Sequence, residues 1–271
     1  ILMMFIVCGA ALYGLILILF YIIQAKMMFF PGPEKFGDCP EMQACGAEAV
    51  SFEDVRYYIL KRPDPDNWII IFHGNAGNAC DRTYFLDIFS DFNSNLVVFE
   101  YPGYGRDGKT PGQSLFLEKA LALVRHMGTI NTSDIPVYLM GESIGTGVAT
   151  FVATEIKVSG LILISAYTSL ARVAKHHYPW LPAHTLMKHP FPASEWAALC
   201  NTPALLIHGK EDDIIPLGFG KEQLAAFAGE KQMLEIPEAG HNDIMDTGRM
   251  LIRERVRHFI KDYNQQKGEK I

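Results

Sequence analysis

The sequence VYLMGESIGTG, residues 137–147, is the strongest indication of the fold of this chain. Its first part, Val137 to Met140, is a short apolar run typical of a buried strand, and a segment with helical spacing, Ile144 to Thr154, follows the GESIG turn. The glycines of this turn allow backbone segments to approach closely and let the central residue adopt a strained conformation. A serine held between a strand and a helix in this way is predicted to be a nucleophile, and that serine is Ser143.

Similar apolar runs recur on both sides of this stretch, each bounded by turn residues. The predicted strands are Trp68 to Phe72, Leu96 to Glu100, Leu161 to Ser165, Ala204 to His208, and Met233 to Ile236. Segments with helical spacing lie between them, at Ser114 to Met127, Phe219 to Phe227, and Arg249 to Ile260. The run from Ala49 to Leu60 predicts a hairpin. This alternation indicates an α/β fold with a mostly parallel, doubly wound sheet.

A serine hydroxyl is almost fully protonated at neutral pH, so Ser143 needs a general base and an acidic residue that orients the base. In sites of this kind both partners follow the serine along the chain, each on a loop after a late strand. The loop GKEDDIIP offers Glu211, Asp212 and Asp213 as the acid, and the loop EAGHND offers His241 as the base. His241 differs from the other histidines because it directly follows the last predicted strand.

The tetrahedral intermediate of acyl transfer needs two N–H donors for its oxyanion. One donor is expected from Ile144, the residue after the nucleophile. The other is expected from HGNAGN, residues 73–78, which follows the run WIIIF. The backbone N–H of Asn75 is the preferred donor there, and that of Ala76 is the alternative. This loop lacks the glycine patterns of nucleotide-binding loops, which disfavours a phosphate site.

The run from Leu2 to Ile23 contains no charged residue, and as a helix of about 33 Å it is long enough to cross the apolar core of a bilayer. We expect a transmembrane helix at residues 1–25, a membrane-proximal junction at 26–48, and one catalytic domain at 49–271. A cleaved signal sequence is one alternative, but the run exceeds the roughly 7–15 apolar residues of such signals. A buried core helix is the other alternative.

Charge and cysteine content exclude several classes of function. The net charge is -6, and 24 Lys and Arg residues are scattered among 30 acidic ones, so no basic patch for nucleic acid is expected. The nine histidines and five cysteines lack the spacing of a metal site. We therefore expect neither a metal nor a cofactor. Cys39 and Cys45 could close a small loop, whereas Cys80 and Cys200 lie apart.

The motifs HGNAGN, EYPGYG at 100–105, GESIGTG, HGKEDDIIP and GHND occur in this order, and together they resemble the α/β-hydrolase superfamily over about residues 50–260. More narrowly, the chain resembles the α/β-hydrolase-domain proteins with one N-terminal membrane span, which include protein depalmitoylases, lysophospholipases and monoacylglycerol lipases. The resemblance implies a serine hydrolase acting on acyl esters or thioesters. It matches the nucleophile to Ser143, the acid to Asp212 and the base to His241.

A short lid is expected at about residues 172–196. Its central stretch, YPWLPAHTLMKHPFP at 178–192, contains four prolines, which argue against a regular helix throughout. Its large apolar side chains either contact the acyl group of a substrate or pack in the core. The residues in question are Tyr178, Trp180, Leu181, Leu186 and Phe191.

The sequence therefore predicts a membrane-anchored serine hydrolase that cleaves acyl esters or thioesters of lipids or lipidated proteins, with the lipid bilayer as a second partner. One alternative is a peptidase or amidase that uses the same three residues. Another is a catalytically silent hydrolase fold that serves as a membrane-tethered binding module. Panels of acyl and peptide substrates distinguish the first alternative, and covalent labelling of Ser143 by a fluorophosphonate distinguishes the second.

Overall fold

The computed structural model describes residues 1–268, and within them one eight-stranded sheet organises the body of the protein. The strands are β1 (Glu48–Phe52), β2 (Val55–Leu60), β3 (Asn67–Phe72), β4 (Ser94–Glu100), β5 (Val137–Glu142), β6 (Gly160–Ile164), β7 (Ala204–Gly209) and β8 (Lys231–Ile236). Their order across the sheet is β1-β2-β4-β3-β5-β6-β7-β8. Strand β2 pairs antiparallel with β1 and β4, and all other pairs are parallel. The predicted α/β fold is confirmed.

The helices of the described part of the chain include α1, which projects from the body, and others that cover both faces of this sheet. They are α1 (Leu2–Met28), α2 (Pro40–Ala44), η1 (Ala79–Arg82), α3 (Thr83–Ile88), α4 (Gln113–Ile130), α5 (Ile144–Glu155), α6 (Leu170–His177), α7 (Ala183–Leu186), α8 (Ala193–Leu199), α9 (Leu217–Ala226), α10 (Ile244–Thr247) and α11 (Arg249–Gly268). One apolar cluster packs α4, α5 and α8 against one face, and a second packs α3, α10 and α11 against the other. Every residue of β3 and β4 is buried, as expected for central strands covered on both sides.

Four short elements were not predicted: α2, η1, α3 and α10. Each has only four to six residues. An apolar pattern needs about two helical turns before its period becomes visible, so helices of this length leave no periodic signal. Helices α6, α7 and α8, in and beside the expected lid, were also not predicted as helices. Helices α4, α5, α9 and α11 were predicted, and they begin and end within a few residues of their expected bounds, apart from α11, which continues to Gly268.

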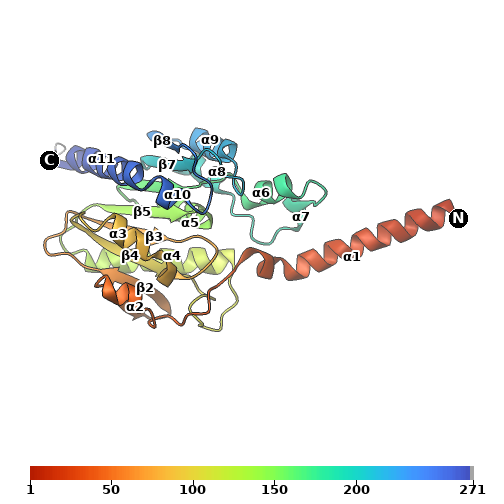
Figure 1. Cartoon of the computed structure of the whole chain (residues 1–271), viewed down its shortest axis with the longest axis horizontal. Helices are drawn as coiled ribbons and strands as arrows, with labels where there is room; N and C mark the ends of the chain where they lie inside the picture. Colours follow the sequence, from red (N-terminus) through yellow and green to blue (C-terminus); the bar gives the residue numbers. More distant parts are fainter. Residues whose placement is uncertain (269–271) are drawn as a thin grey trace.

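Helix α1 projects from the body at the end where α6 and α7 lie (Figure 1). An 18-residue window of this helix has a mean hydropathy of 2.6, and none of the residues of α1, all of which the structure describes, is buried. These facts exclude the core-helix alternative. The helix runs three residues beyond the expected end at 25, to Met28, and it stops shortly before Pro31.

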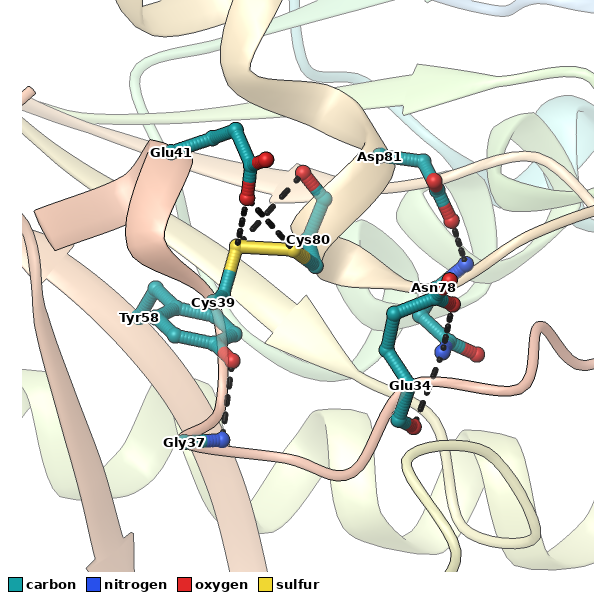
Figure 2. Close-up of a disulfide and its surroundings, with 8 residues drawn as sticks. All are labelled: Glu34, Gly37, Cys39, Glu41, Tyr58, Asn78, Cys80 and Asp81. Atoms are coloured by element: carbon teal, nitrogen blue, oxygen red, sulfur yellow. Dashed lines mark hydrogen bonds between the residues drawn. A yellow bond between two sulfur atoms is a disulfide. The ribbon is translucent and has the colours of Figure 1, made fainter. Parts of the chain in front are cut away.

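A disulfide joins the junction to the body, but not at the expected pair. Cys39 is bonded to Cys80, with their Cα atoms 5.8 Å apart, whereas Cys45 is a free, exposed thiol (Figure 2). The predicted Cys39 and Cys45 loop is therefore wrong. The reason is α2, which fills the interval between these two cysteines. Six residues of helix rise about 9 Å, which is beyond the span of a disulfide.

We expect loss of this disulfide to destabilise the body. The bond closes a loop across 41 residues of sequence, and the chain-entropy relation gives about 4 kcal/mol for a loop of this size. The free energy of unfolding of a Cys39→Ser/Cys80→Ser variant, measured by denaturant titration in detergent, should fall by about that amount. Cys45→Ser is the matched control. A double variant as stable as the parent would contradict this account.

Candidate active site

Ser143 sits at a sharp turn between β5 and α5. Its backbone φ is 51°, in the left-handed region that non-glycine residues rarely adopt, and its N–H donates to the carbonyl oxygen of Ile164 at 2.9 Å. The turn is tight because Gly141 and Gly145 lack side chains. A Cβ on Gly145 would lie 2.0 Å from the carbonyl oxygen of Phe72. The local sequence thus explains why a strained serine can be held at this point.

The loops after β7 and β8 bring an acid and a base to this serine. His241 Nε2 lies 3.0 Å from Ser143 Oγ, and His241 Nδ1 lies 2.8 Å from Asp212 Oδ2. All three side chains are thus linked in one chain of hydrogen bonds. The alternative acids, Glu211 and Asp213, are exposed to solvent. The structure therefore brings Asp212, and neither neighbour, to the histidine.

Asp212 is held as a carboxylate. Burial raises its pKa, but the hydrogen bond and charge of His241 outweigh burial, so the pKa lies below its ordinary value. The second carboxylate oxygen, Oδ1, accepts hydrogen bonds from the N–H groups of Ile214 at 3.1 Å and Ile215 at 2.7 Å. An ionised, fully hydrogen-bonded acid of this kind can orient an imidazole ring and stabilise its charged form.

A second histidine supports the acid, and sequence reasoning placed it only at a strand end. His208 is fully buried in β7, where its Nε2 lies 2.7 Å from the carbonyl oxygen of Ile215 and 3.5 Å from Asp212 Oδ2. Burial lowers the pKa of His208, which favours the neutral ring. A neutral ring with Nε2 protonated donates to Ile215 and thereby braces the loop that carries Asp212.

The loop after β3 lies beside Ser143, as the sequence predicted for the loop with the second N–H donor. Asn75 and Ile144 line the same pocket as Ser143. Because Ile144 is the first residue of α5, its N–H has no partner within the helix and is available to a ligand. His73 Nδ1 lies 2.6 Å from the carbonyl oxygen of Gly74, which fixes the orientation of the peptide that carries the Asn75 N–H. The Tyr104 hydroxyl donates to the carbonyl oxygen of Asn75 at 2.7 Å and fixes the next peptide. Ala76, the alternative donor, is exposed and is absent from the pocket lining.

An ion pair that was not predicted joins this loop to the serine turn. Glu142 Oε2 accepts hydrogen bonds from Arg82 Nε at 2.9 Å and from the Tyr84 hydroxyl at 2.8 Å, and the N–H of Gly74 lies 3.3 Å away. Arg82 also donates to the carbonyl oxygen of Ala76 at 2.6 Å. Glu142 directly precedes Ser143, so this network sets the distance between the nucleophile and the HGNAGN loop. In the sequence, the only indication of this ion pair is the Glu of the GESIG motif.

The junction is also bound to the HGNAGN loop. Phe30 and Ala76 form an isolated bridge, and the N–H of Gly32 donates to Asn78 Oδ1 at 2.9 Å. The Asn78 amide in turn donates to Glu34, and the disulfide follows two residues later in the chain (Figure 2). The segment that leaves α1 is therefore packed against the HGNAGN loop, which carries the expected oxyanion donor.

Known proteins similar to this chain fall into two groups, relatives by sequence and neighbours by structure. The uncharacterised protein YfhR of Escherichia coli O157:H7 is 30% identical over 256 residues, which cover 88% of this chain and 87% of YfhR. The human alpha/beta hydrolase domain-containing protein 17B is 29% identical over 207 residues, covering 75% and 69%. An uncharacterised membrane protein of Saccharomyces cerevisiae is 26% identical over 217 residues, covering 77% and 74%. No family model matches the chain.

Among solved structures, an esterase of Pyrococcus furiosus superposes with a TM-score of 0.69 at 15% identity, over 87% of this chain and 97% of the esterase. The chain has the α/β-hydrolase fold. In this α/β-hydrolase the carboxyl ends of β5, β7 and β8 carry Ser143, Asp212 and His241, at the edge of the sheet where ligands bind in open α/β folds.

A pocket of about 270 Å³ opens beside Ser143 of the α/β-hydrolase. Of the predicted acyl-contacting residues of the lid, Tyr178, Leu181 and Leu186 line this pocket. Trp180 and Phe191 do not, which corrects that expectation. Phe191 is fully buried in the core, where it packs against Trp196, and Trp180 is turned toward α1. Apolar residues in a proline-rich segment look alike in sequence, whether they face a pocket or the core.

Residues of α1 form another wall of the same pocket, which the sequence did not indicate. They are Phe20, Tyr21, Gln24, Met27 and Met28. The α/β-hydrolase body thus presents a cavity whose lining is shared between the catalytic loops, the lid and the N-terminal helix.

A buried glutamate near this site makes stability depend on pH. Burial raises the pKa of Glu100 to about 8, against the opposing charge of Arg56, and Glu100 Oε1 has no hydrogen-bond partner within the described part of the chain. Because this folded-state pKa lies above the ordinary value of 4.5, the associated stability is complete below pH 4.5 and is lost as the pH rises through about 8. We expect the melting temperature of the parent to fall across this window relative to Glu100→Gln, which stays neutral. Parallel melting curves would contradict the assignment.

Proposed function

We propose that this protein is a membrane-anchored serine hydrolase that cleaves acyl esters or thioesters of lipids or lipidated proteins. The observation that carries the proposal is the hydrogen-bonded series of Ser143, His241 and Asp212 at the edge of a largely apolar pocket. Each member has the position and the partner that acyl transfer requires.

The reaction proceeds in two steps. Ser143 Oγ attacks the carbonyl carbon while His241 Nε2 accepts the hydroxyl proton, and the N–H groups of Asn75 and Ile144 bind the oxyanion. The intermediate collapses, and the alcohol or thiol leaves with the proton from His241. Water then attacks the acyl-enzyme with His241 as base, which releases the carboxylic acid and restores Ser143. No step requires a metal or a cofactor.

Apolar side chains around the serine support an acyl group as the part of the substrate that is bound. The pocket walls include Leu170, Val173, Leu181, Leu186 and Ile215. Burial of each methylene of an acyl chain against such walls is favourable by about 0.8 kcal/mol. A polar peptide would leave its amide groups without partners in this cavity, which disfavours the peptidase alternative.

Contacts between α1 and the lid support a retained anchor over a cleaved signal sequence. The Tyr13 hydroxyl donates to the carbonyl oxygen of Trp180 at 2.8 Å, and Gln24 Nε2 donates to that of Leu186 at 3.1 Å. Removal of α1 would leave these groups unpaired and would open one wall of the pocket. The membrane-protein relative from yeast is consistent with an anchor.

A substrate panel tests the proposal. Purified protein in detergent should hydrolyse acyl esters with a dependence on chain length, and it should hydrolyse peptide amides far more slowly. A fluorophosphonate should label Ser143 covalently, with release of fluoride. Absence of both labelling and ester hydrolysis would favour a silent binding module, and faster cleavage of peptides than of esters would favour a peptidase.

A further inference from the structure

The N-terminal helix is more than a tether. We propose that the last two turns of α1 form the acyl-binding wall of the active site together with the lid, so that the acyl chain of a membrane-resident ester passes from the bilayer to Ser143 between α1 and the lid. This inference rests on the proposed hydrolase function, because it names the route and the binding surface of its substrate.

The spacing of the pocket residues on α1 shows that one face of the helix is dedicated to the cavity. Phe20 lies four residues before Gln24 and Tyr21 lies three residues before it. Met27 and Met28 lie three and four residues after Gln24. Residues at these intervals share one side of a helix. Between them, Ile22 points away and is 67% exposed. A membrane span that only anchored the body would not need a continuous face that lines the pocket of Ser143.

Gln24 joins the lid to this face of α1 through two hydrogen bonds. Its Nε2 donates to the carbonyl oxygen of Leu186, and its Oε1 accepts from the N–H of Lys188 at 2.6 Å. The Lys188 ammonium lies 4.0 Å from the centre of the Tyr21 ring. One amide side chain thus satisfies two backbone groups of the lid, and Gln24 itself lines the pocket. Gln24 is therefore positioned to hold the mouth of the cavity at a fixed width.

The lid follows α1 into the region that the bilayer would occupy. The contact of Tyr13 with Trp180 lies eleven residues before Gln24, about 16 Å along the helix axis. Phe20 packs edge to face on Trp180, whose side chain is still 48% exposed. Exposed aromatic residues with a polar atom are typical of membrane interfaces. The tip of the lid therefore lies beside the part of α1 that a bilayer would surround, and the pocket that both elements line is next to this contact.

This arrangement explains how a water-insoluble ester could reach a serine in the body. An acyl chain that slides between α1 and the lid exchanges one apolar environment for another, so it avoids the cost of exposure to water. The scissile carbonyl, at the head of the chain, then arrives at Ser143 at the inner end of the pocket. Short soluble esters do not need this wall.

The test compares two esters in the full chain reconstituted in phosphatidylcholine vesicles. The probes are 4-methylumbelliferyl palmitate dissolved in the vesicles and 4-methylumbelliferyl acetate added in water. Gln24→Ala removes two hydrogen bonds, so we expect the ratio of kcat/KM for palmitate to that for acetate to fall about tenfold, mainly through the KM for palmitate. Tyr21→Ala should lower the same ratio.

The matched control is Ile22→Ala, on the opposite face of the same helix, which should keep the parental ratio. The inference is overturned if Gln24→Ala and Tyr21→Ala keep that ratio. It is also overturned if they lower the rates for palmitate and acetate equally, because α1 would then act only through the overall structure. If the proposed hydrolase function itself is wrong, the result differs from both of these outcomes. In that case the parent hydrolyses neither ester and Ser143 is not labelled by a fluorophosphonate.

The disulfide carries a second inference independently. We infer that the body of the protein lies in an oxidising compartment, outside the cytosol. Structural disulfides persist in such compartments and are reduced in the cytosol. Cys39 is fully buried, and it is not paired within a Cys-x-x-Cys motif, which argues for a structural bond over a redox-catalytic one. Lys26 lies in the last turn of α1 and Lys35 follows the helix on the body side, but two lysines are a weaker constraint than a covalent bond.

Thiol tagging and protease access test this location. Cells that express the full chain are quenched in acid, free thiols are blocked with N-ethylmaleimide, and thiols released by reduction are tagged with maleimide-polyethylene glycol. We expect two tags on the parent and none on Cys39→Ser/Cys80→Ser. Protease added to sealed right-side-out vesicles should digest the body. Absence of tags after reduction, or protection of the body from protease, would overturn the inference.

Discussion

Replacing Ser143 by alanine should lower kcat for acyl esters by about 10⁴-fold or more. The hydroxyl is the only group at the turn that can form the acyl-enzyme, and the strained backbone at φ 51° presents it directly to His241 Nε2. The alanine side chain lacks the hydroxyl nucleophile but still fits the turn. The measurement is release of 4-nitrophenol from a medium-chain ester, together with loss of fluorophosphonate labelling.

The control for this variant is Ser133→Ala, because Ser133 is an exposed serine in the loop before β5, at the other end of that strand from the Ser143 turn. It should retain parental activity and labelling. Thermal unfolding of Ser143→Ala should remain cooperative, which separates loss of chemistry from loss of fold. Parental activity in Ser143→Ala would remove Ser143 from the mechanism, whatever the geometry of its neighbours.

The sheet and the three candidate catalytic residues were predictable because their signals are local. Strand β3 is a run of six buried residues, and the loop after it begins with the HGNAGN motif. Ser143 has its strand, turn and helix within one stretch. His241 and the three neighbouring acids 211–213 lie on loops after late strands, so strand prediction brings them to one edge of the sheet, and the family resemblance favours Asp212 among the acids.

What could not be predicted depends on contacts between residues far apart in the sequence. Arg82 and Glu142 are separated by 60 residues, and Gln24 and Lys188 by 164. Neither pair has a spacing that distinguishes it from any other pair of polar residues on the surface. The same holds for Cys39 and Cys80, because sequence alone does not determine how several cysteines pair. These links become visible only in the folded structure, which brings η1 beside β5, the lid beside α1, and the junction beside η1.

Asp212→Asn should lower kcat by about 10⁴-fold and leave the fold intact. An amide in place of the carboxylate can donate to Nδ1 of His241, which favours the tautomer with a proton on Nε2, so that the ring cannot accept the Ser143 proton. The amide oxygen can still accept from Ile214 and Ile215, which preserves the loop. Asp213→Asn and Glu211→Gln are matched controls, because both side chains are exposed and neither contacts His241. The measurement is the rate of each of the three variants on one ester. A large loss of rate in Asp213→Asn or Glu211→Gln, with little loss in Asp212→Asn, would assign the role of the acid to that neighbour.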